Sequence, residues 1–147
     1  MRLRTSRERA RLLHLCLLAG YALLVAVAVL WPTPVDAGAN STLQAVLAAL
    51  HEAGGPRWID YNLVESGANV LMFVPLGLLA ALLMPTGWRS LAPAGAFLLS
   101  GAVEWAQREF LPGRYASLQD VWTNTLGAAL GTVLAYAWLE FRQNRHR

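Results

Sequence analysis

The sequence has no lysine, a single cysteine and few charged residues of either sign. Only 14% of its 147 residues are charged, against roughly 25% in a typical soluble domain. Because Cys16 is alone, a disulfide within the chain and a cysteine-rich metal site are both excluded. All twelve basic residues are arginine, and most lie near the two chain ends instead of forming a basic stripe. We therefore expect no nucleic-acid binding.

Hydrophobic residues are abundant, at 56%, and they are arranged in long runs with little charge. Four runs are long enough to cross a hydrocarbon core of about 30 Å as helices: 12–31, 67–84, 91–111 and 120–139. The sequence therefore predicts an all-α fold, a polytopic membrane helix bundle with about four transmembrane helices. In this prediction 1–11 is a basic N-terminus, 32–66 a loop, 67–140 the core of the bundle and 141–147 a tail.

Two segments of this layout have alternative interpretations. The positive start, the first apolar run and residues 35–37 (VDA) also fit a cleaved signal peptide. The run is longer than a usual signal core, which favours an uncleaved helix. In the loop, apolar residues at helical spacing predict a short helix over 41–52. This helix is expected either to lie on the outer membrane surface or to pack on the bundle.

Arginines predict the orientation, because basic residues in short loops are retained on the cytoplasmic side. They concentrate in the N-terminal segment, in the turn at Arg89 and in the C-terminal tail. The other two connections contain only Arg57 and Arg114. We therefore predict a multi-pass protein of the plasma membrane with both termini in the cytoplasm. The 41–52 helix would then be extracytoplasmic.

Polar residues of three predicted helices fall at one depth. Glu104 would lie about 20 Å along the third span, and so roughly 10 Å below the outer edge of the hydrocarbon core. Asn69 begins the second span, and Asp120 and Asn124 begin the fourth. Ionisable residues inside a membrane usually face the bundle interior or a water-filled cavity and mark a functional site. The coincidence in depth therefore predicts a binding or catalytic site near the outer face.

Helical spacing also places these residues on shared faces. The third helix carries Gly101, Glu104, Gln107 and Arg108 on one side, through three- and four-residue steps. Purely structural interpretations remain open: the asparagines can be interhelical hydrogen-bond links, and Glu104 with Arg108 can be a surface ion pair. The candidate packing glycines are Gly77, Gly101, Gly127 and Gly131, the last two forming a GxxxG motif.

Several of these segments resemble the VanZ-like family of membrane proteins. Residues 69–77 (NVLMFVPLG) match its N-h-h-x-F-h-P-h-G pattern, where h is hydrophobic. Residues 104–107 (EWAQ), 111–114 (LPGR) and 120–127 (DVWTNTLG), followed by Gly131, match its next segments in order. The Asp-Lys-x-x-His segment of some members has at best a distant counterpart in residues 60–62 (DYN), since lysine is absent. The resemblance implies a bacterial cell-envelope membrane protein associated with low-level resistance to the glycopeptide teicoplanin, and it brings no defined biochemical activity.

Three functional hypotheses follow. The first is binding of an anionic lipid head group, a cell-wall precursor or a lipoglycopeptide, because guanidinium groups pair bidentately with phosphate and carboxylate. The candidate ligand-binding residues are Asn69, Glu104, Gln107, Arg108, Arg114, Asp120 and Asn124. The second is an enzyme acting on a lipid-linked phosphate or sugar, with Glu104 and Asp120 as acid and base. The third is a structural subunit that forms a homo-oligomer through the GxxxG face of the fourth helix. We expect no cofactor and no bound metal.

Overall fold

The computed structural model describes residues 6–30, 40–111 and 117–145, and within them the chain forms helices and no strand. The elements are α1 (Ser6–Leu30), α2 (Asn40–Glu52), α3 (Tyr61–Leu83), the 3-10 helix η1 (Thr86–Leu91), α4 (Ala92–Phe110) and α5 (Leu118–Asn144). The predicted all-α bundle is confirmed, and the predicted 41–52 helix is present as α2. Its position relative to a membrane stays a prediction.

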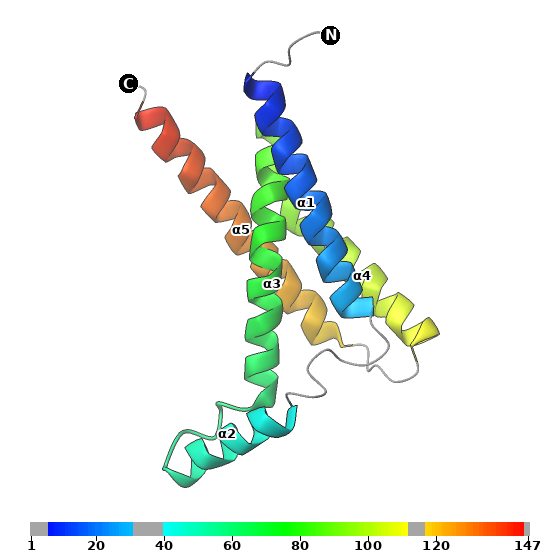
Figure 1. Ribbon diagram of the computed structural model, residues 1–147, viewed down its shortest axis with the longest axis vertical. Coiled ribbons are helices and arrows are strands. Elements are labelled where there is room, and N and C mark those ends of the chain that lie inside the picture. Colours follow the sequence, from blue (N-terminus) through cyan, green and yellow to red (C-terminus); the bar gives the residue numbers. More distant parts are fainter. Residues whose placement is uncertain (1–5, 31–39, 112–116, 146–147) are drawn as a thin grey trace.

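Two crossed helices, α3 and α5, form the centre of the bundle (Figure 1). The helix α1 packs along α3, and α4 packs mainly against α5. The start of α1 and the end of α5 lie at one end of the bundle, whereas α2 lies at the opposite end, across the direction of the long helices. Consecutive long helices therefore run in alternating directions.

Local hydrogen bonds explain where α3 begins and how α1 is attached to it. Asp60 Oδ1 accepts a hydrogen bond from the Leu63 N–H at 2.9 Å, which caps the helix before the apolar run starts. Pro75 lies inside α3 and has no N–H to donate. One turn away, the Tyr21 hydroxyl of α1 donates to the Met72 carbonyl at 3.1 Å. The side chain thus ties α1 to α3 where the proline interrupts the hydrogen-bond ladder.

Three glycines bring the backbones of α3 and α5 into direct contact. A Cβ atom at Gly131 would overlap the Val74 carbonyl of α3, and one at Gly77 would lie 2.5 Å from Ala128 Cα of α5. Gly127 meets the α3 backbone in the same way. Small residues at such positions permit the close packing that holds membrane helices together. Because α3 covers Gly127 and Gly131, an oligomer through α5 would have to use another side of that helix.

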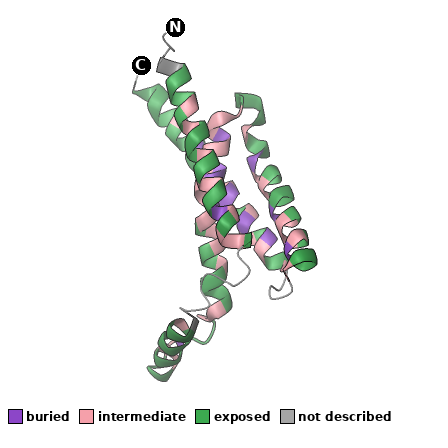
Figure 2. Ribbon diagram, turned by 45° about the vertical axis from the view of Figure 1, so that its right-hand side comes forward, coloured by how far each residue is buried: buried purple, intermediate pink, exposed green. Residues whose placement is uncertain are grey.

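Large apolar side chains are exposed on every long helix, while the buried residues follow the inner faces (Figure 2). Among the described residues, Glu8–Leu30 and Tyr61–Leu83 are long and apolar enough to cross a membrane. Only 6% and 22% of their most apolar windows are buried, so neither is the core helix of a soluble fold. The helices α4 and α5 include more polar residues, and they expose Leu98 at 71% and Val133 at 63%.

Candidate functional site

The N-terminus of α5 is capped by residues from two helices. The Ser117 hydroxyl accepts a hydrogen bond from the Gln119 N–H at 3.2 Å, which is an N-cap bond to the second residue of the helix. In the capping box that Ser117 and Asp120 suggest, the acid three residues later would bond back to the Ser117 N–H. Here Glu104 of α4 does so instead, with its Oε2 accepting at 2.6 Å. The carboxylate thus links α4 to the positive end of the α5 dipole.

Asp120, the residue that would complete the capping box within α5, bonds to α3 instead. Its Oδ1 accepts a hydrogen bond from Asn69 Nδ2 at 2.8 Å, and both side chains are half-buried. One turn nearer the end of the bundle, Gln119 Nε2 donates to Ser66 Oγ at 2.7 Å. These two bonds join the first turns of α5 to the first half of α3.

The other two amide residues of the predicted site are buried and bridge further helix pairs. Asn124 Nδ2 donates to Ser100 Oγ at 2.8 Å, which joins α5 to α4. Gln107 Nε2 donates to the Val29 carbonyl at 2.6 Å, which joins α4 to α1. Val29 lies in the last turn of α1, where carbonyls have no partner within the helix. The glutamine therefore satisfies an acceptor that the helix itself leaves open.

A pocket of about 170 Å³ lies between α4 and α5 beside the cap. It is lined by Gly101, Glu104, Trp105, Arg108, Ser117, Leu118 and Val121. The Arg108 side chain is exposed at the last turn of α4. Gly101 borders this open space, which is why a Cβ atom built there meets nothing within 4 Å. Gly101 therefore makes no close contact with another helix, unlike the three glycines between α3 and α5.

The structure divides the predicted ligand-binding set into separate groups. Glu104 and Arg108 line the α4–α5 pocket, and Asn69 pairs with Asp120. Gln107 and Asn124 are each bonded to another helix, and Arg114 lies outside the described residues. Sequence reasoning did not assign Ser117 or Trp105 to the pocket. The capping signal identified Ser117 as a helix start, but nothing local indicates which distant acid bonds to its N–H.

The acid–base hypothesis rests on Glu104 and Asp120, and each carboxylate accepts a hydrogen bond from another element. Within residues 6–30, 40–111 and 117–145, no three His, Cys, Asp or Glu side chains are grouped so that they could hold a metal ion. The described geometry accordingly gives both carboxylates roles in holding helices together.

An all-helical bundle that exposes large apolar side chains on every long helix, and joins these helices by buried and half-buried amide side chains, has the character of a membrane protein. A comparison with family models matches residues 18–139 to the VanZ/LLP1 family. The chain belongs to this family, and the predicted VanZ-like resemblance is confirmed. The match extends from α1 to α5 and thus covers more than the quoted motifs. Searches among curated proteins and among solved structures found no match.

Proposed function

We propose that this VanZ/LLP1 protein is a four-pass protein of the cell envelope that binds an anionic head group at the outer leaflet. The binding site is the α4–α5 pocket. The observation that carries the proposal is the arrangement of Glu104 and Arg108 there. The carboxylate is held by the Ser117 N–H, whereas the guanidinium is exposed at the pocket. The site therefore offers a positive group beside a pocket of about 170 Å³.

Phosphate and carboxylate are the ligand chemistries that suit this site, because a guanidinium forms two parallel hydrogen bonds with either. Trp105, which is 61% exposed beside the pocket, is the residue type that settles at head-group level. Arg114, outside the described residues, is proposed as a second guanidinium from the adjoining connection. An anionic phospholipid or a lipid-linked cell-wall precursor carries the required phosphate. A lipoglycopeptide such as teicoplanin carries a carboxylate and would compete, which connects the site with low-level resistance.

The four crossings are supported by three features of the bundle. The long helices alternate in direction, the start of α1 and the end of α5 share one end, and α4 and α5 expose large apolar side chains. The distribution of arginines supports an orientation with the α2 end outside. Under this arrangement the α4–α5 pocket lies near the outer leaflet, since it adjoins the start of α5.

Cysteine labelling tests this topology. With the native Cys16 replaced by serine, single cysteines are introduced as Ser41→Cys in α2 and Gly87→Cys in η1, both at exposed positions. A membrane-impermeant thiol reagent is expected to label position 41 in intact cells, and position 87 only after permeabilisation. Labelling of both positions from the same side would contradict the four-pass arrangement.

Head-group binding is tested by the lipids that purified protein retains. Arg108→Ala is expected to lower the amount of co-purified anionic lipid about tenfold, the effect of losing one charge-assisted contact. Arg142→Ala is the matched control, because Arg142 is exposed in the last turn of α5, at the other end of the bundle. Mass spectrometry of retained lipids provides the measurement. An equal loss of anionic lipid in both variants would show that only the net charge of the protein matters, and would refute binding in the pocket.

A further inference from the structure

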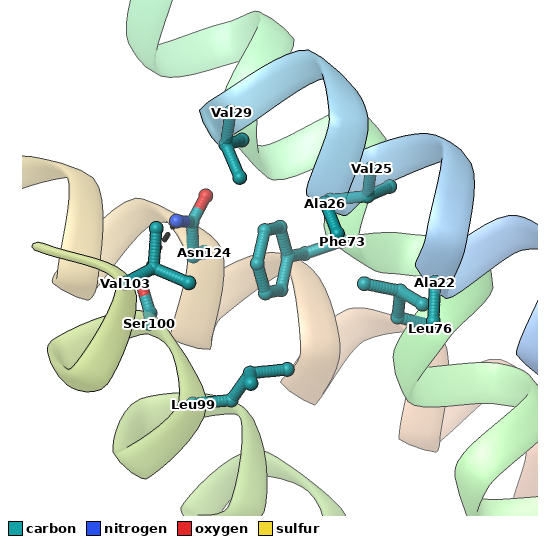
Figure 3. Close-up of a pocket in the computed structure, with 10 residues that line it drawn as sticks. All are labelled: Ala22, Val25, Ala26, Val29, Phe73, Leu76, Leu99, Ser100, Val103 and Asn124. Carbon is teal, nitrogen blue, oxygen red and sulfur yellow. Dashed lines mark hydrogen bonds between the residues drawn. The ribbon is translucent and has the colours of Figure 1, made fainter. Parts of the chain in front are cut away.

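A second cavity, of about 240 Å³, lies on the other side of α4, among α1, α3, α4 and α5 (Figure 3). It is lined by Ala22, Val25, Ala26, Val29, Phe73, Leu76, Leu99, Ser100, Val103 and Asn124. Eight of these ten residues are apolar and none is charged. The two polar residues, Ser100 and Asn124, are hydrogen-bonded to each other at 2.8 Å. The cavity therefore differs in chemistry from the α4–α5 pocket.

Asn124 has an unsatisfied hydrogen-bond acceptor at this cavity. Its side chain is only 7% exposed, and its Oδ1 is buried with no partner within the described structure. Its Nδ2 is already bonded to Ser100, and the amide oxygen points away from that bond, toward the Val29 side (Figure 3). Buried carbonyl oxygens nearly always have a donor. An acceptor left open beside an apolar cavity indicates a ligand that supplies one donor.

We propose that this cavity binds one neutral aliphatic chain ending in a hydroxyl group, with the hydroxyl donating to Asn124 Oδ1. The ligand is neutral because no charged side chain lines the cavity to compensate an ionised group. At about 30 Å³ per atom, the share of a water molecule in the liquid, the volume admits about eight non-hydrogen atoms. An apolar cavity of about 150 Å³ already binds benzene in an engineered protein. The hydroxyl end of a longer aliphatic alcohol, with about eight of its non-hydrogen atoms in the cavity, meets all three requirements.

The alternative occupant is water, and the lining argues against it. A buried water typically makes about three hydrogen bonds, whereas only Ser100 and Asn124 offer polar side-chain atoms here. The walls formed by Phe73, Leu76 and Leu99 offer none. An aliphatic chain satisfies the amide oxygen and fills the apolar space at once. The proposal is independent of head-group binding, since Ser100 and Val103 line this cavity while Gly101 and Glu104 line the other pocket.

The test uses the full chain in phosphatidylcholine vesicles and an octanol that carries a photoreactive diazirine. Labelled residues are identified by mass spectrometry. Two competitors are compared: 1-octanol, which has a donor, and 1-methoxyheptane, which has the same number of non-hydrogen atoms and no donor. We expect labelling of the cavity walls, and 1-octanol to compete about three- to tenfold more strongly, as one hydrogen bond allows. Equal competition, or labelling confined to the exposed helix surfaces, would overturn the proposal and leave water as the occupant.

Two variants make the test specific. Asn124→Leu removes the acceptor, and the preference for 1-octanol over the ether is expected to vanish. Because this variant also deprives Ser100 of its partner, Ala26→Leu gives an independent arm by filling the cavity from α1. Val27→Leu is its control, since Val27 is 50% exposed and lies outside the lining. Labelling should fall at least fivefold in Ala26→Leu and stay unchanged in Val27→Leu, a threshold of about 1 kcal/mol. Unchanged labelling in Ala26→Leu would refute binding in this cavity.

Discussion

Replacing Gly131 by alanine is expected to lower the free energy of unfolding by about 2–3 kcal/mol, at the upper end for an overpacked core. The added Cβ would overlap the Val74 carbonyl and lie 2.7 Å from the Leu78 N–H group of α3. These are backbone atoms, which cannot rotate away as a side chain can, so α3 and α5 must move apart. Circular dichroism in detergent, followed through thermal unfolding, measures the loss.

The matched control is Gly95→Ala in α4, where a Cβ atom would meet nothing within 4 Å. Alanine favours a helix over glycine by roughly 0.5–1 kcal/mol, so this variant should be unchanged or slightly more stable. The same substitution is thus expected to change the free energy of unfolding in opposite directions at two helical positions. A loss of similar size in both variants would show that the α3–α5 contact is not the reason.

The positions of the long helices could be read from hydropathy, because an apolar run has few ways to satisfy its backbone in a membrane other than by forming a helix. The ends of these helices could not be predicted from hydropathy. The second span was predicted over 67–84, yet α3 begins at Tyr61, because Asp60 caps a helix start whose first six residues include the polar Asn62, Glu65 and Ser66. Similarly α5 continues to Asn144, beyond the predicted 120–139, through a segment in which Glu140, Arg142 and Gln143 favour a helix without being apolar.

The position of each polar residue along its helix could also be predicted, because the rise per residue is fixed in a helix, whereas their depth in a membrane stays a prediction. The hydrogen-bond partners of these residues could not be predicted, since they depend on how the helices are rotated against one another. Asp120 lies where the acid of a capping box would lie, yet it bonds to Asn69. Glu104 of α4 accepts the hydrogen bond from the Ser117 N–H instead. Gln107 reaches a carbonyl 78 residues away in the chain. No local pattern contains that information.

The hydrogen bonds change the meaning of the polar cluster. Four helices are linked by the amide side chains of Asn69, Gln107 and Asn124, as the structural interpretation of the asparagines predicted. Individually such bonds are weak, about 0.6 kcal/mol on average in a membrane protein. Together they set the rotation of α4 against α1 and α5, which places Glu104 and Arg108 beside the same pocket. The linking residues therefore shape the site without facing its ligand.

The second large effect is expected at Glu104. Glu104→Ala removes the acceptor for the Ser117 N–H, and we expect it to lower the free energy of unfolding by about 2 kcal/mol, as for other hydrogen bonds to charged groups. Glu109→Ala is the control on the same helix, because Glu109 is exposed, and surface substitutions usually change stability by no more than about 0.5 kcal/mol. Thermal unfolding of the two variants beside the wild type gives the comparison.

Glu104→Gln separates the capping role of this residue from its role in the pocket. The amide oxygen still accepts from the Ser117 N–H, so the loss should stay below about 1 kcal/mol, the difference between a charged and a neutral acceptor. The negative charge beside Arg108 is nevertheless gone, which leaves the guanidinium freer to pair with a phosphate. Retention of anionic lipid should then be equal to or greater than in the wild type. If Glu104→Gln is as unstable as Glu104→Ala, the carboxylate acts through its charge on the helix dipole and not through the bond to Ser117.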